Sequence, residues 1–153
     1  MKLTDKKFAV RAIENGTVID HIPSESLFKI IRIMRLDRET HRITIGNNLE
    51  SKRIGTKAII KIADRYCKNE ELNRIALVAP MARVNIIRDF EVIEKRQVEV
   101  PEAISGFFRC ANPACITNNE PMRTSFIVIQ GAEIALKCCY CDKITYQNQI
   151  DLT

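Results

Sequence analysis

The chain has 153 residues, of which 24 are Lys or Arg and 19 are Asp or Glu, so its formal net charge is +5. A hydrophobic content of 46% excludes a disordered chain. No apolar run approaches the roughly 20 residues that a membrane-spanning helix needs, and the polar start lacks a signal peptide. We therefore expect a cytoplasmic protein, in which six cysteines predict metal ligands or free thiols more than disulfides.

Charge and cysteines are distributed unevenly along the chain. Residues 1–100 contain 20 Lys and Arg against 14 Asp and Glu, whereas residues 101–153 contain 4 against 5. Five of the six cysteines also lie in the second segment. This contrast predicts two domains, 1–100 and 101–153, that meet near Pro101. The second is so small that a bound metal is expected to supplement its core.

The first segment combines strand-like alternation with two helical patterns. Strands are predicted at 8–13, 17–22, 42–45, 58–62, 82–86 and 90–92, a helix after Pro23, and a second helix with Asn69 as its N-cap that ends at Pro80. The β-α-β-β-α-β order is typical of a ferredoxin-like, split-βαβ fold of the α+β class. Two helices would cover one face of the sheet, and the opposite face would be open to a ligand.

Two features of the predicted sheet have both a structural and a functional interpretation. Lys61 interrupts an apolar run and would share a strand face with Ile59 and Ala63. It is either a lysine on a solvated face or a phosphate-binding cation. The adjacent Asp20 and His21 are either structural or able to orient a sugar, a base or a metal-bridged phosphate.

The second segment is expected to form a small all-β, zinc-binding domain. It carries two close pairs of cysteines, one on each side of a predicted hairpin over residues 126–136. Spacings of four and two intervening residues suit two knuckles that converge on a tetrahedral, structural Zn²⁺ site. Four thiolates leave no open coordination position, so a catalytic metal is not expected. Cys67 and Cys139 are predicted to be free thiols without a catalytic role. The predicted ligands are Cys110, Cys115, Cys138 and Cys141.

Several motifs in this order resemble one known family, the regulatory chain of aspartate carbamoyltransferase. They are GTVIDHIP at 16–23, RITIG at 42–46, IKI at 60–62, Ala79-Pro80 with Val84-Asn85, and the four cysteines. The resemblance runs from about Val10 to Gln149. It implies a non-catalytic subunit whose homodimers link catalytic trimers, with CTP and ATP as effectors that give feedback control of pyrimidine biosynthesis. UTP and Mg²⁺ are further candidate ligands.

The resemblance also implies the positions of the contact residues. The zinc-binding segment would dock on the catalytic chain with Asn112 and Lys143 as contacts. Arg11, Phe90 and Ala114 depart from the family's pattern and bear on the ranking of effectors and on docking. The implied effector-binding residues are Ala12, Ile13, Val18, Asp20, His21, Lys57, Lys61, Asn85, Ile87, Val92 and Lys95.

Two other classes of protein share some of these sequence features. A zinc-ribbon nucleic-acid-binding protein is allowed by the knuckles and the net charge, but the cysteine segment is acidic and the basic residues are not interleaved with aromatic ones. A small enzyme would need a nucleophile beside a base, and the sequence offers no such constellation. We therefore expect no nucleic acid and no membrane among the partners.

Overall fold

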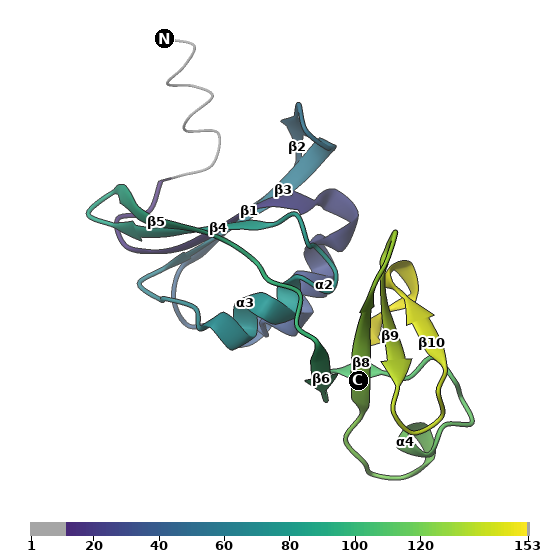
Figure 1. The fold of residues 1–153 in the computed structure, drawn as a ribbon. Coiled ribbons are helices and arrows are strands. Elements are labelled where there is room, and N and C mark those ends of the chain that lie inside the picture. The colour runs from purple at the N-terminus through teal and green to yellow at the C-terminus, as the bar shows by residue number, and fades with distance from the viewer. Residues whose placement is uncertain (1–11, 153) are drawn as a thin grey trace.

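The computed structural model describes residues 12–152 (Figure 1). The strand expected at 8–13 therefore lies mostly outside the described residues, and Ala12 and Ile13 are not in a strand. An antiparallel sheet has the strand order β2-β3-β1-β4-β5. Its strands are β1 (Gly16–Pro23), β2 (Ile43–Ser51), β3 (Gly55–Ala63), β4 (Arg83–Arg88) and β5 (Glu91–Gln97). The order of the first four strands is that of the split-βαβ fold, so the predicted α+β class is confirmed.

Helices cover one face of this sheet. The helices α2 (Leu27–Ile33) and α3 (Asn69–Ile75) lie on the same side of it (Figure 1), with short 3₁₀ turns at Ser24–Ser26 and Leu36–Arg38. Ile19, Ile60 and Val84 face these helices and are fully buried. Because side chains alternate along a strand, their neighbours Val18, Lys61 and Asn85 lie on the opposite, helix-free face.

Three local predictions are wrong. Helix α3 ends at Ile75 and not at Pro80. Strand β2 does not break at Gly46 but continues to Ser51 through an irregularity between Gly46 and Leu49, because Asn48 takes a left-handed backbone (φ 56°) within the ladder. The N-cap of α3 is Lys68 and not Asn69. The backbone N–H of Lys68 donates to Glu71 Oε1 (3.4 Å), while the Asn69 side chain accepts from Arg96 (2.5 Å).

The cysteine-bearing segment forms a second, smaller sheet with the order β10-β9-β8-β6. The predicted hairpin is present as β8 and β9. The strands of this sheet are β6 (Ala103–Ser105), β8 (Ser125–Gln130), β9 (Ile134–Cys138) and β10 (Ile144–Tyr146). A separate pair is formed by β7 (Phe108–Arg109) and β11 (Asp151–Leu152). The segment also contains the short helix α4 (Ile116–Asn119) and a 3₁₀ turn (Gln147–Gln149). None of the described helices is long and apolar enough to cross a membrane.

The apolar core is continuous across the two sheets. Phe108, Ile150 and Leu152 of the cysteine segment belong to the same buried cluster as residues of α2 and α3. Polar contacts cross the same seam, since Arg32 Nη1 lies 3.4 Å from Asp151 Oδ1. The division at residue 100 stays a prediction, and the shared core implies that the two parts stabilise each other.

Candidate metal centre and ligand face

The four predicted zinc ligands meet at one point. The Sγ atoms of Cys110, Cys115, Cys138 and Cys141 all lie within 4.8 Å of one another. Sγ–Sγ distances are 3.5 Å for Cys110 and Cys141 and 3.7 Å for Cys115 and Cys138. A tetrahedron with Zn–S bonds of about 2.3 Å has S–S edges of about 3.8 Å. The spacing therefore fits one four-coordinate zinc ion with little adjustment.

Backbone hydrogen bonds hold the two knuckles in shape. In the first, the N–H of Cys115 donates to the backbone carbonyl of Asn112 (3.0 Å). The side-chain Oδ1 of Asn112 accepts from the backbone N–H of Ala114 (3.0 Å). In the second, the N–H of Cys138 donates to the carbonyl of Lys143 (2.9 Å). Asn112 and Lys143 thus belong to the metal-binding loops themselves. Their expected contact with another subunit stays a prediction.

The thiols of the cluster differ in acidity. Burial raises the pKa of Cys110 to about 12. Burial also opposes ionisation of Cys141, but hydrogen bonds from the Lys143 backbone and the Asn112 side chain outweigh it and lower the pKa to about 7. Metal ligation requires thiolates, so binding must release protons, and the apparent affinity falls as the pH falls.

The remaining two cysteines lie outside the cluster. Cys139 is exposed, and its Sγ accepts a weak hydrogen bond from Ser125 Oγ (3.6 Å). Cys67 is buried in the core beside Thr17, and burial raises the pKa of its thiol. A buried thiol with a raised pKa is a poor nucleophile, as the sequence led us to expect.

On the helix-free face of the large sheet, predicted effector residues from three strands flank Val18 in a single row. The register pairs Lys61 of β3 with Val18 of β1, Val18 with Asn85 of β4, and Asn85 with Lys95 of β5. Directly opposed residues of an antiparallel pair share one face. Four residues that are distant in the sequence are thereby brought side by side. The row thus has one lysine at each end, with the small apolar side chain of Val18 and the amide side chain of Asn85 between them.

A charged group lies next to this row at the end of β1. Lys57 Nζ is 2.9 Å from Asp20 Oδ1, which also accepts from the backbone N–H of His21 (2.6 Å). His21 has a left-handed backbone (φ 57°) at the irregularity in β1. Its Nδ1 is buried without a hydrogen-bond partner among residues 12–152. Burial lowers the pKa of His21 and also that of Lys61. The negative charge of Asp20 opposes the change in both residues.

The other end of the face is apolar. Ile13, Val18, Ala63 and Ile87 form a small buried cluster that is separate from the main core, with Ile59 packed against it. Val92 lies opposite Ile87 in the register but is 46% exposed, and Ala12 is also exposed. The predicted residues thus run from an apolar group at one end of the face, through the row with Lys61 and Lys95, to the charged group at the other end.

A cavity of about 340 Å³ opens at the charged end. Three of its lining residues were not predicted. Alternation along β4 could have found Arg83, because it lies two residues before Asn85 and so shares its face. Arg96 and Gln97 had no comparable signal, since the sequence did not establish how far β5 extends. The lining residues are Asp20, His21, Arg83, Asn85, Lys95, Arg96 and Gln97.

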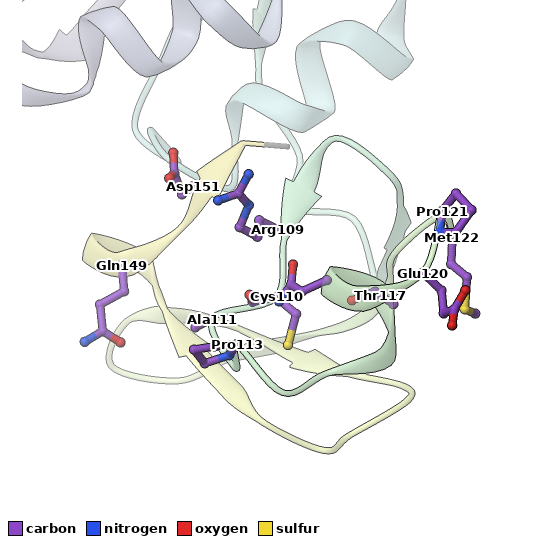
Figure 2. Close-up of a pocket in the computed structure, with 11 residues that line it drawn as sticks. Arg109, Cys110, Ala111, Pro113, Thr117, Glu120, Pro121, Met122, Gln149 and Asp151 are labelled. Carbon is purple, nitrogen blue, oxygen red and sulfur yellow. Dashed lines mark hydrogen bonds between the residues drawn. The ribbon is translucent and has the colours of Figure 1, made fainter.

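A larger cavity of about 810 Å³ lies beside the metal cluster, between the first knuckle and the C-terminal segment (Figure 2). Arg109 is the cation in its lining, and it is accompanied by the carboxylates of Glu120 and Asp151. This balance is unsuited to a polyanion. Of the two cavities, the smaller one on the large sheet therefore has the better chemistry for a phosphorylated ligand.

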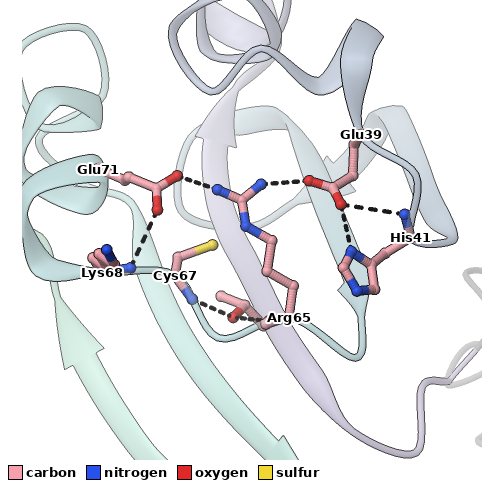
Figure 3. A network of polar contacts seen from close by, with 7 residues as sticks. Glu39, His41, Arg65, Cys67, Lys68 and Glu71 are labelled. Carbon is pink, nitrogen blue, oxygen red and sulfur yellow. Dashed lines mark hydrogen bonds and ion pairs between the residues drawn. The ribbon is translucent and has the colours of Figure 1, made fainter.

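A second polar network lies away from both sites and joins three segments (Figure 3). Arg65 binds Glu39 (2.5 Å) and also Glu71, which caps α3. Glu39 in turn accepts from the side chain of His41 (2.5 Å). The hydrogen bond with His41, with those from Arg65, lowers the pKa of Glu39 to about 2. The sequence did not predict this network, because its members are brought together only by the fold.

The fold and the two sites define a two-part protein that combines a ferredoxin-like ligand face with a four-cysteine metal centre. All four donors of the metal centre are cysteines, an arrangement that is typical of structural zinc sites and not of catalytic ones. Comparison with known proteins agrees with both parts. Residues 8–99 match the allosteric domain of the aspartate carbamoyltransferase regulatory chain, and residues 102–151 match its metal-binding domain.

Relatives match over nearly the whole chain. The aspartate carbamoyltransferase regulatory chain of Porphyromonas gingivalis is 55% identical over 147 residues, which are 96% of this chain and 97% of the relative. That of Phocaeicola vulgatus is 54% identical over 99% of both chains. That of Pyrococcus abyssi is 46% identical over 92% of this chain and 94% of the relative. The chain belongs to the family of aspartate carbamoyltransferase regulatory chains, and so is a regulatory and not a catalytic chain.

Proposed function

We propose that this chain binds CTP and ATP on the helix-free face of its large sheet and thereby gives feedback control of aspartate carbamoyltransferase. The row of Lys61, Val18, Asn85 and Lys95 carries the proposal. A lysine on a sheet face is normally solvated. Lys61 lies on β3, which has a neighbouring strand on each side, and its side chain is partly desolvated. Two lysines, with Lys57 nearby, offset much of the charge of a nucleoside triphosphate.

The division of the face supports a nucleotide as the ligand. The apolar group around Ile13 and Ile87 suits the flat surfaces of a base, and the charged end suits the phosphates. Asp20 would then position Lys57, and Mg²⁺ would assist the phosphates. UTP has the same phosphate chain and is a further candidate.

We further propose that the four clustered cysteines hold one structural Zn²⁺ and that the metal-binding part docks on the catalytic chain. Asn112 and Lys143 support this because they lie in the two metal-binding loops. Loss of the metal would therefore disturb the docking surface itself. A homodimer of regulatory chains would link catalytic trimers.

Calorimetric titration of CTP into the zinc-loaded chain tests the effector proposal. We expect saturable binding that Lys61→Ala largely abolishes. The matched control is Lys29→Ala, which removes the same charge from α2 on the opposite, helix-covered side of the sheet. If the wild-type chain binds neither CTP nor ATP, the proposal is wrong; if both variants lose affinity equally, the effect is one of net charge.

A second experiment tests the assembly. The chain should co-purify with a separately expressed carbamoyltransferase catalytic chain, and CTP should change the activity of that complex. Removal of zinc with a chelator should release the catalytic chain. Retention of the complex without zinc would contradict docking through the metal-binding loops.

A further inference from the structure

Arg83 is a cation of the charged cavity that neither the sequence nor the family resemblance assigns to a site. It lies on β4 directly opposite Asp20 of β1, and on its other side opposite Gln97 of β5. All three residues line the same cavity. Arg83 therefore extends the ligand face by one row beyond the row of Val18 and Asn85.

The carboxylate facing Arg83 is already engaged elsewhere. Asp20 pairs with Lys57 at 2.9 Å, and within residues 12–152 Arg83 itself makes no ion pair. The neighbouring Arg96 differs, because its guanidinium binds Glu94 (2.8 Å) and Asn69 (2.5 Å). Arg83 is thus the arginine of this cavity whose donors are available to a ligand.

The position of Arg83 along the sheet indicates which part of a nucleotide it would meet. The apolar group includes Ile87, four residues from Arg83 on the same strand and the same face. Four residues of an antiparallel strand span about 14 Å. That is comparable to the distance from the base to the last phosphate of an extended nucleoside triphosphate. A base held at Ile87 would bring the end of the phosphate chain to Arg83.

We propose that Arg83 binds the terminal phosphate of the effector and so makes the site selective for triphosphates over diphosphates and monophosphates. The planar guanidinium can donate two parallel hydrogen bonds to one phosphate, which a lysine cannot do. Lys95 lines the same cavity one row nearer to Ile87 and would meet the phosphates nearer the sugar. This inference rests on the proposed nucleotide site and deepens it.

The test compares CTP, CDP and CMP by calorimetry on the zinc-loaded full chain. A charge-assisted hydrogen-bond pair predicts that Arg83→Gln weakens CTP binding about tenfold or more while CMP binding changes less than about twofold. Arg83→Lys should be intermediate for CTP. Arg88→Gln is the control, since it removes the same charge from the far end of the same strand. Because Arg83 is exposed, the variant should fold as the wild type does, which circular dichroism can check.

The outcomes separate the two proposals. If the wild type binds CTP but Arg83→Gln binds it equally well, the assignment of Arg83 is wrong and the effector site stands. Equal weakening of CTP and CMP by Arg83→Gln would also overturn the assignment to the terminal phosphate. If the wild type binds no nucleotide at all, the effector site fails, and the role of Arg83 fails with it.

Discussion

The guanidinium of Arg74 lies over the ring of Phe107, 3.7 Å from its centroid. Arg74 belongs to α3, under the large sheet, and Phe107 lies between β6 and β7 of the metal-binding part. Burial lowers the pKa of Arg74. With the Arg32–Asp151 pair, this contact joins the two parts across the shared core. If the effector and the catalytic chain bind different parts, as we propose, the coupling between them has to cross this seam.

The Arg74–Phe107 contact should be measurable by a double-mutant cycle. We expect Arg74→Met and Phe107→Leu to be non-additive, with a coupling free energy of about 0.5–2 kcal/mol. Both replacements keep most of the apolar volume, so the cycle isolates the attraction of cation and ring. Urea unfolding of the zinc-loaded proteins gives the four free energies. Additivity within about 0.3 kcal/mol would show that the contact contributes nothing.

Of the two adjacent cysteines Cys138 and Cys139, only Cys138 should be needed for zinc binding. Cys138→Ser removes a member of the tetrahedral cluster and should abolish stoichiometric zinc, whereas Cys139→Ser should keep one ion per chain. Elemental analysis after dialysis measures both. Loss of zinc in Cys139→Ser, with retention in Cys138→Ser, would reverse the ligand assignment.

Gly16 at the start of β1 should tolerate no side chain. Its backbone has φ 137°, and an added Cβ would lie 2.0 Å from the carbonyl oxygen of Ile62 in the neighbouring strand. Gly16→Ala should therefore destabilise the protein by more than about 3 kcal/mol, visible as a large fall in the melting temperature. Gly55→Ala is the control, since φ is also positive (85°) but no atom lies within 4 Å. We expect it to cost only about 1 kcal/mol, for backbone conformation alone.

Glu39 should make stability depend on pH in the acid range. Its pKa falls from the usual 4.5 to about 2 on folding, so the stabilisation is full above pH 4.5 and is lost as the pH falls towards 2. The change in pKa sets an upper bound of about 3.4 kcal/mol on the cost of Glu39→Gln at pH 7, and we expect about 2 kcal/mol because the amide oxygen keeps part of the hydrogen bonding. The difference in unfolding free energy between wild type and variant should shrink between pH 4.5 and 2. The comparison cancels the loss of metal at low pH, and a constant difference would contradict the prediction.

Local chemistry made part of this molecule predictable. Alternation and helical spacing located the strands and helices of the large sheet, and two pairs of cysteines predicted the four thiols that the fold clusters. The errors arose where a tertiary contact overrides a local preference. Asn48 bends β2 without ending it, because β3 supplies hydrogen bonds on both sides of the irregularity. Asn69 is not the cap, because Glu71 reaches the N–H of Lys68.

By itself the sequence determined the α+β class, the metal-binding chemistry and the family, because these depend on residue type, spacing and order along the chain. Only the tertiary structure decided which side chains share a surface. Strand register aligned Lys61, Val18, Asn85 and Lys95, and it brought Arg83 opposite Asp20. It also placed the ring of Phe107 under Arg74. Register and packing depend on contacts between residues far apart in the chain, which local patterns do not encode.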